Sequence, residues 1–209
     1  MKHTNDLIIV HFQEGFFDNT NQDIKSTVLS TLTPMVKNAI KANMHVSFWE
    51  DVTSSDPTSI IDLSSFNKKV SREDAPGGVN KSYIVHGAEI TLTGGWFGAC
   101  IKNAIRSILL AFFKNKELIK TGELTIRMPS KAVYDENELL ADMSDANIGL
   151  DIVDALERSA VLNQLEVRER GLQVRIAKSK TQETILEKIL VAVPHKPTLQ
   201  IFDVVFLID

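Results

Sequence analysis

The sequence predicts an α/β fold with three layers, in which a mostly parallel sheet carries helices on both faces and ends in a C-terminal α+β extension. Short apolar runs have the length and the β-branched content of strands that are buried on both faces. Segments with apolar residues at helical spacing lie between these runs, and the two kinds alternate along most of the chain. We expect residues 1–209 to form a single domain, because this length suits one α/β unit.

The first half of the chain alternates strands with helices. Residues 7–12 are continuously apolar and predict the first strand. Apolar residues recur at helical spacing over 23–42, and Pro34 inside this pattern is expected to kink the helix or divide it into two. The elements predicted next are a strand over 45–49, a long polar loop over 53–82 with one helical turn near Ile60, a strand over 89–93 and an amphipathic helix over 97–114.

The second half of the chain mixes helices with a hairpin. Residues 199–208 are mostly apolar and predict a last strand, buried either within the sheet or across a dimer. The other elements predicted here are a strand over 124–128, a helix over 136–162 that Gly149 interrupts, a hairpin over 165–178 that turns at Arg170 and Gly171, and a helix over 181–191.

Charge and cysteine content exclude several classes of protein. The 27 acidic residues outnumber the 23 basic ones, so we expect neither nucleic acid nor a membrane surface as a partner. The longest apolar runs, 108–113 and 204–208, are far shorter than the ~20 residues that cross a bilayer. The single cysteine and the absence of a secretion signal favour a cytoplasmic protein. We expect a small-molecule ligand and homo-oligomerisation, and neither a cofactor nor a metal.

The turn after the third predicted strand is the most informative place for chemistry. Ligands of open parallel sheets bind beyond the carboxyl ends of the strands. Gly94 and Gly95 permit a tight turn there, which brings backbone N–H groups close to a ligand. Cys100 follows in the first turn of the helix, where the helix dipole lowers a thiol pKa. The alternative is an inert core cysteine, because Cys100 shares its helix face with Ala104 and Ile108.

Two short motifs resemble the isochorismatase-like cysteine hydrolases. Residues 7–17, Leu-Ile-Ile-Val-His-Phe-Gln-Glu-Gly-Phe-Phe, look like the opening strand and turn of that family. Gly94, six residues before Cys100, is similar to its Gly-x5-Cys-Val element. The resemblance implies a three-layer α/β core over 1–130 and hydrolysis through a thiol nucleophile, assisted by an Asp and a Lys. Residues 160–209 would then be an added hairpin, helix and strand.

The sequence departs from this family at the catalytic positions. His11 stands where the resemblance places the catalytic Asp, and it either acts as a base beside Cys100 or only bonds a loop. Lys81 is the nearest candidate for the catalytic Lys, and a solvated loop lysine is the alternative. The residues expected to line a substrate pocket, or otherwise to pack in the core, are Gly94, Gly95, Trp96 and Trp49.

Two functional hypotheses follow from these departures. The first is a degenerate isochorismatase-like protein that binds a ligand or assembles into oligomers without catalysis, because the Asp is missing. The alternative is a cysteine hydrolase acting on a small amide, ester or vinyl-ether substrate. Cys100 would then attack a carbonyl-type carbon, His11 would assist proton transfer, and the amides of residues 94–99 would stabilise the oxyanion.

Overall fold

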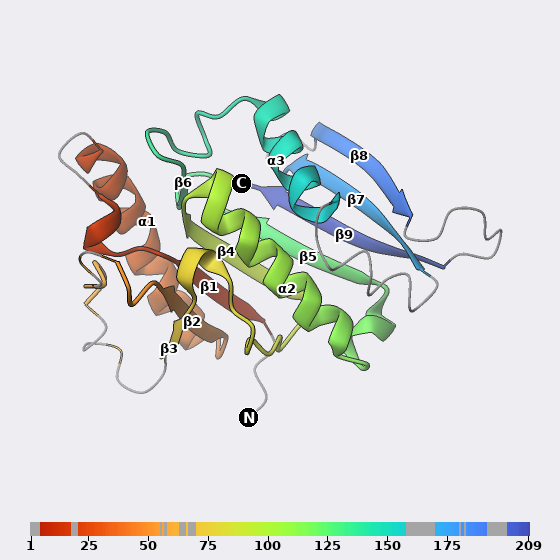
Figure 1. Cartoon of the computed structure of the whole chain (residues 1–209), viewed down its shortest axis with the longest axis horizontal. Helices are drawn as coiled ribbons and strands as arrows, with labels where there is room; N and C mark the ends of the chain where they lie inside the picture. The colour runs from red at the N-terminus through yellow and green to blue at the C-terminus, as the bar shows by residue number, and fades with distance from the viewer. Residues whose placement is uncertain are drawn as a thin grey trace.

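A nine-stranded mixed sheet forms the middle layer of the protein (Figure 1). The computed structural model describes residues 5–17, 21–54, 56, 58–62, 66, 70–157, 170–179, 181, 183–191 and 200–209. The strand order is β3-β2-β1-β4-β5-β9-β7-β8, with β6 beside β4, and every pair except β7 with β8 is parallel. The strands are β1 Asp6–Val10, β2 His45–Glu50, β3 Val70–Asp74, β4 Glu89–Gly95, β5 Glu123–Met128, β6 Val133–Tyr134, β7 Arg170–Lys178, β8 Glu183–Val191 and β9 Gln200–Ile208.

Helices cover both faces of this sheet, which confirms the predicted fold class. The helices are α1 Gln22–Lys41, α2 Lys102–Lys114 and α3 Asp145–Glu157. Successive residues of β1 face opposite sides, so Leu7 and Ile9 join the core under α1, whereas Ile8 and Val10 join the core under α2 and α3. Figure 1 shows α2 and α3 over one face of the sheet. The described residues contain no helix that is both long and apolar enough to cross a bilayer.

Helix α1 is continuous through Pro34, so of the two predicted alternatives, a kink or a division of this helix, the division is wrong. Proline removes one intrahelical hydrogen bond and crowds the preceding turn. Val28 and Leu32 before it and Val36 after it are all fully buried against the sheet. This packing on both sides of Pro34 outweighs the local loss.

The predicted polar loop over 53–82 contains an edge strand that the sequence analysis missed. Strand β3 carries only one apolar residue, Val70, and pairs in parallel with β2. Polar side chains hold it there: Arg72 Nε lies 2.6 Å from Glu50 Oε2, and Ser47 Oγ donates to Glu73 Oε1 at 2.6 Å. Edge strands are commonly polar because one side of their backbone faces solvent.

The C-terminal extension has strands where the sequence predicted a hairpin and a helix. The predicted turn at Arg170 and Gly171 is wrong, because both residues lie within β7. The predicted helix over 181–191 is also wrong, since these residues contribute β8, antiparallel to β7. Leu186 and Leu190 are four positions apart, which fits both the spacing of a helix face and the alternation of a strand. Pairing with the apolar residues of β7 favours the strand. Residues 158–169 and 192–199 lie outside the described part of the chain.

Helix α3 is shorter than the helix predicted over 136–162. It begins at Asp145, where Ser144 Oγ accepts a hydrogen bond from the Asn147 N–H at 3.3 Å and so acts as its N-cap. Gly149 does not interrupt the helix, and a Cβ there would meet Leu186 of β8 at 3.9 Å. The end of the prediction, residues 158–162, lies outside the described residues. Strand β9 lies inside the sheet between β5 and β7, as one of the two alternatives for 199–208 predicted.

Candidate active site at the carboxyl edge of the sheet

The candidate site lies where the strand order reverses, between the adjacent strands β1 and β4. In the sheet, β2 and β3 lie on one side of β1, and β4 and β5 lie on the other side. Crevices at such switch points are where open α/β sheets bind ligands. His11 directly follows β1, and Phe97–Ile101 forms a π-helical turn between β4 and α2 that carries Cys100. The short helical turn Pro76–Gly78 follows β3 at the same edge.

Gly94 and Gly95 are required by the packing of neighbouring strands. Gly94 has φ +97°, and a Cβ on it would lie 2.0 Å from the backbone oxygen of Val10. A Cβ on Gly95 would lie 2.4 Å from the ring of Tyr134 on β6. The peptide bond between Gly95 and Trp96 is cis. The close approach of β1 and β6 explains both glycines without a ligand, and their predicted role in substrate binding stays a prediction.

Cys100 is the chain's single cysteine. Its side chain is buried in the apolar core that lies under α2 and α3. Burial raises the pKa of Cys100, and the negative charges of Asp51 and Asp135 raise it further. A hydrogen bond with the backbone of Trp96 opposes this rise only in part. The direction is opposite to the lowered pKa that the helix start predicts. The thiol therefore stays protonated at neutral pH.

His11 is held by its backbone and by one ring nitrogen. Its N–H donates to the Trp49 carbonyl at 2.8 Å, and its own carbonyl accepts from the Tyr134 hydroxyl at 3.0 Å. The ring Nε2 lies 2.8 Å from the carbonyl oxygen of Ala75. A carbonyl only accepts, so Nε2 carries the proton of the ring. Burial lowers the pKa of His11, which keeps the ring neutral.

The second ring nitrogen of His11, Nδ1, is buried and has no hydrogen-bond partner among the described residues. In the neutral ring it carries a free lone pair. A buried polar atom without a partner costs about 1–3 kcal/mol. The residue also has φ +49°, a left-handed conformation that is strained for any residue but glycine. His11 therefore carries both an unmet acceptor and backbone strain, two features common at functional sites.

No hydrogen bond joins His11 to Cys100 in the described part of the chain, although both contact the loop after β3. Ala75 accepts the hydrogen bond of His11. Three residues later Gly78 packs on the cysteine, because a Cβ there would lie 2.1 Å from the backbone oxygen of Cys100. The loop after β3 thus contacts both predicted catalytic groups at the same edge. Its Ala75 carbonyl also accepts the ring N–H of His11, so this proton is already in a hydrogen bond.

Lys81, the third predicted catalytic residue, is exposed and lines a cavity of about 410 Å³ along α2. Ser107 and Leu110 line the same cavity. Ser107 lies two helical turns after Cys100, a rise of about 10 Å. No interaction joins Lys81 to Cys100 among the described residues, and the catalytic role predicted for this lysine stays a prediction.

The two tryptophans predicted to line a pocket have different surroundings. Trp49 is fully buried and meets the ring of Tyr83 edge to face, with centroids 5.1 Å apart. Trp96 is half-buried, and its ring meets Phe16 edge to face at 5.8 Å. Phe16 in turn stacks on the His11 ring at 4.9 Å and 11°. Trp96 therefore belongs to an aromatic row with Phe16 and His11, whereas Trp49 packs inside the core.

Two carboxylates near the thiol were not part of the predicted catalytic set. Asp51 follows β2, and a hydrogen bond from Thr53 lowers its pKa, which keeps it ionised. Asp135 follows β6, and its Oδ2 accepts a hydrogen bond from the Gly98 N–H at 3.1 Å. No local signal marks Asp135 in the sequence, because strand β6 is only two residues long.

The chain has an isochorismatase-like α/β fold, as the following solved structures show. A pyrazinamidase/nicotinamidase from Streptococcus mutans matches the structure with a TM-score of 0.50 and 13% identity, over 71% of this chain and 93% of that chain. A MAR1 ribonuclease from Caenorhabditis elegans matches at 0.49 and 12%, over 79% and 83%. A nicotinamidase from Bacillus subtilis matches at 0.48 and 12%, over 73% and 92%. At such identities the likeness is one of fold.

The sequence itself matches no protein-family model and no curated protein. The fold implied by the two motifs around residues 7–17 and 94–100 is nevertheless confirmed by the structural match.

Proposed function

We propose that the chain is a binding protein built on the isochorismatase-like fold, and that Cys100 does not act as a nucleophile in it. One observation carries the proposal: the thiol is buried, its pKa is raised, and the charges acting on it are the carboxylates of Asp51 and Asp135. A nucleophilic cysteine needs a nearby cation or an adjacent base to become a thiolate. Here the electrostatic surroundings oppose ionisation.

The aromatic row of His11, Phe16 and Trp96 is the proposed place of the ligand. Two buried polar atoms of this row find no hydrogen-bond partner in the described part of the chain, the His11 Nδ1 acceptor and the Trp96 Nε1 donor. Phe16 and Trp96 are half-buried, so their rings border solvent. A small molecule with both a donor and an acceptor satisfies these atoms and stacks on the rings.

The first test is the rate at which iodoacetamide alkylates Cys100 across pH, because the chain has no other thiol. We expect the folded protein to react at least about tenfold more slowly than the urea-unfolded chain, since only the thiolate reacts and burial disfavours it. The matched reference is a Cys100→Ala chain with Glu117→Cys, whose side chain is 80% exposed in the wild type. Intact mass gives the extent of reaction.

The outcome that contradicts this proposal is a fast reaction of the folded wild type. A thiolate that titrates below about 8.5, with the shift lost in His11→Ala, defines a Cys-His pair. It would make the protein an enzyme rather than a binding module.

The second candidate function is hydrolysis through Cys100, and the free lone pair of His11 Nδ1 is the observation that favours it. A neutral imidazole with an open nitrogen is a general base if a substrate brings the thiol into reach. Nicotinamide is the first probe, because the matching Streptococcus mutans protein is a pyrazinamidase/nicotinamidase. Ammonia release that saturates with substrate, and that Cys100→Ser abolishes, supports the hydrolase and excludes the binding module.

Homo-oligomerisation belongs to the same proposal. Strands β3 and β8 are the two edges of the sheet, and an edge strand pairs readily with a second copy. Ile189 on β8 is 55% exposed, an unusual exposure for an isoleucine. Light scattering after size exclusion tests this, and Ile189→Lys is expected to turn a dimer into a monomer. A wild type that elutes as a monomer at all concentrations contradicts it.

A further inference from the structure

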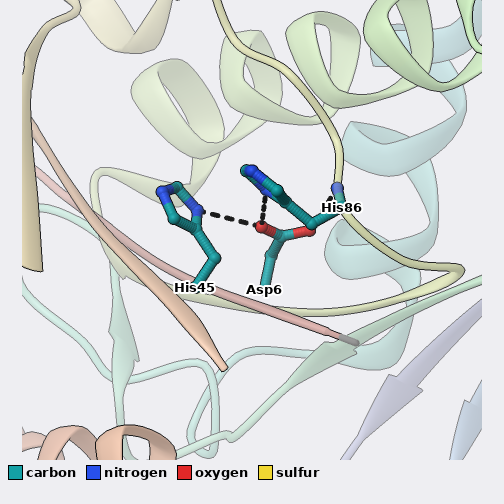
Figure 2. A group of neighbouring side chains, drawn as sticks. All are labelled: Asp6, His45 and His86. Atoms are coloured by element: carbon teal, nitrogen blue, oxygen red, sulfur yellow. Dashed lines mark hydrogen bonds and ion pairs between the residues drawn. The ribbon is translucent and has the colours of Figure 1, made fainter. Parts of the chain in front are cut away.

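A second cluster of titratable side chains lies at the opposite edge of the sheet, away from His11 and Cys100. Asp6 is the first residue of β1, and His45 is the first residue of β2. His86 lies three residues before β4. The three strands are parallel neighbours, so their amino ends meet at one edge. Figure 2 shows the imidazoles of His45 and His86 reaching the same oxygen of the Asp6 carboxylate.

The three side chains converge on one carboxylate oxygen. Asp6 Oδ1 lies 3.0 Å from His45 Nδ1 and 2.8 Å from His86 Nδ1. The imidazole rings are 4.1 Å apart between centroids. One donor atom from each residue lies within 4.8 Å of the other two. These separations are close to those between the ligands of a tetrahedral zinc ion, whose bonds are about 2.0–2.2 Å long.

Charge and access both suit a cation. Asp6 is fully buried, and its carboxyl group accepts hydrogen bonds from the His45 ring and from both the ring and the backbone N–H of His86. The side chains of His45 and His86 are 19% and 29% exposed, so the cluster opens to solvent on the imidazole side.

We propose that Asp6, His45 and His86 form a binding site for one divalent transition-metal ion, of which Zn²⁺ is the representative. The ligands are Asp6 Oδ1 and the Nδ1 atoms of both histidines, an N₂O set that suits Zn²⁺, Co²⁺ and Ni²⁺. The ion takes the place of the Nδ1 protons that face Asp6, and these protons go to solvent. The fourth position is open to water. This inference is independent of the function proposed for the carboxyl edge.

The groups behind the ligands are arranged as a metal site requires. A histidine that binds through Nδ1 carries its proton on Nε2 and donates it to a second group, which fixes the ring. His45 Nε2 lies 3.4 Å from Ser71 Oγ, and Ser71 Oγ donates to Glu73 Oε1 at 3.0 Å. The other oxygen of the carboxylate, Asp6 Oδ2, accepts a hydrogen bond from the backbone N–H of His86 at 2.9 Å. These bonds orient two of the three ligands before any ion binds.

The test is titration of the purified, chelator-treated wild-type chain with ZnCl₂ in a calorimeter, and with CoCl₂ followed by visible absorption. We expect one ion per chain and a Co²⁺ spectrum of tetrahedral N/O coordination. His45→Gln and His86→Gln should each raise the Kd for Zn²⁺ by at least about a hundredfold, because each removes a ligand. Ser71→Ala should raise it by about tenfold, the low end for loss of a supporting group.

The controls separate this site from the carboxyl edge. Cys100→Ser and His11→Gln remove the thiol and the imidazole of that edge and should leave the stoichiometry and the Kd for Zn²⁺ unchanged. Both ligand variants change partly exposed side chains, so circular dichroism is expected to confirm that they fold. If one variant does not fold, the other variant is used for the test. Wild-type protein that binds no ion at 100 μM ZnCl₂ overturns the proposal and leaves a hydrogen-bonded triad. Binding that survives both ligand variants, or that Cys100→Ser abolishes, also overturns it.

Discussion

The two edges of the central sheet carry the same kinds of side chain in opposite arrangements. At the carboxyl edge, His11 and Cys100 lie near Asp51, but no hydrogen bond in the described structure joins the ring to the thiol, and burial holds both groups neutral. At the amino edge, one buried carboxylate binds two imidazoles directly. There the histidine hydrogen bonds outweigh burial and keep Asp6 ionised.

This difference teaches that burial by itself does not make a reactive site. A buried titratable group becomes charged only where a partner of suitable charge or hydrogen-bonding capacity faces it. His45 and His86 supply such partners to Asp6, whereas the described surroundings of Cys100 supply carboxylates. We therefore expect metal chemistry at the amino edge and ligand binding at the carboxyl edge. The following changes test that contrast, from the largest expected effect to the smallest.

Gly94→Ala is expected to lower the free energy of unfolding by at least about 3 kcal/mol, the range of severe single substitutions. Its new Cβ would lie 2.0 Å from Val10 O, a backbone atom that cannot move aside. The control is Gly122→Ala, where φ is +80° but no atom of the described residues lies within 4 Å of the new Cβ, and we expect a loss of about 1–2 kcal/mol there. Urea unfolding measures both. Equal losses would mean that β1 and β4 can separate at the carboxyl edge.

Asp6→Ala is expected to lower the free energy of unfolding by about 2–3 kcal/mol, because hydrogen bonds to a charged group are among the strongest. Two imidazoles and the His86 N–H lose their shared acceptor. Glu183→Ala, which removes an exposed carboxylate on β8, should change stability by less than about 0.5 kcal/mol. If the two variants lose the same stability, the triad at the amino edge is not a stabilising network.

His11→Gln is expected to flatten the pH dependence of stability below about pH 6.5, the ordinary pKa of histidine. Burial lowers the pKa of His11 in the folded protein, so the unfolded chain binds its proton first as pH falls. The wild type thus has its full stability above pH 6.5 and loses part of it toward acid. Thermal unfolding of both chains across pH measures the difference, and parallel curves would contradict it.

Lys81→Ala is expected to change neither stability, within about 0.5 kcal/mol, nor the alkylation rate of Cys100. The lysine is exposed and lines the cavity along α2, and no described interaction joins it to the thiol. The same alkylation assay provides the measurement. If Cys100 is alkylated more slowly in this variant, or with a shifted pH dependence, Lys81 acts on the thiol, as the family resemblance implies.

Much of the α/β core could be predicted from the sequence, because local periodicity reports burial. The apolar run at 7–12 corresponds to β1. The helical spacing over 97–114 corresponds to the π-helical turn Phe97–Ile101 and to α2, which follows it directly. Strand β3 could not be found in this way, since four of its five residues are polar and an ion pair and a side-chain hydrogen bond with β2 hold it. Residues 181–191 carry a helical spacing, and only their pairing with β7 makes them a strand.

The candidate groups of the carboxyl edge could be named from the sequence, but their chemistry could not. His11 and Cys100 follow strand ends, which a linear motif reveals. The direction of the Cys100 pKa depends on Asp51 and Asp135, which lie about 50 and 35 positions away and reach the thiol only through folding. The opposite edge escaped notice for the same reason, because its carboxylate and imidazoles are separated by 39 and 80 positions.

The sequence by itself determined which segments are buried and in what order strands and helices follow one another, because the period of apolar residues is a local property of the chain. Only the tertiary structure decided which polar side chains share an edge and with which charges they interact. The reason is geometric, since parallel pairing of β1, β2 and β4 brings distant residues together at the strand ends. The protonation of each group then follows from those neighbours, and so does the metal binding proposed for the amino edge.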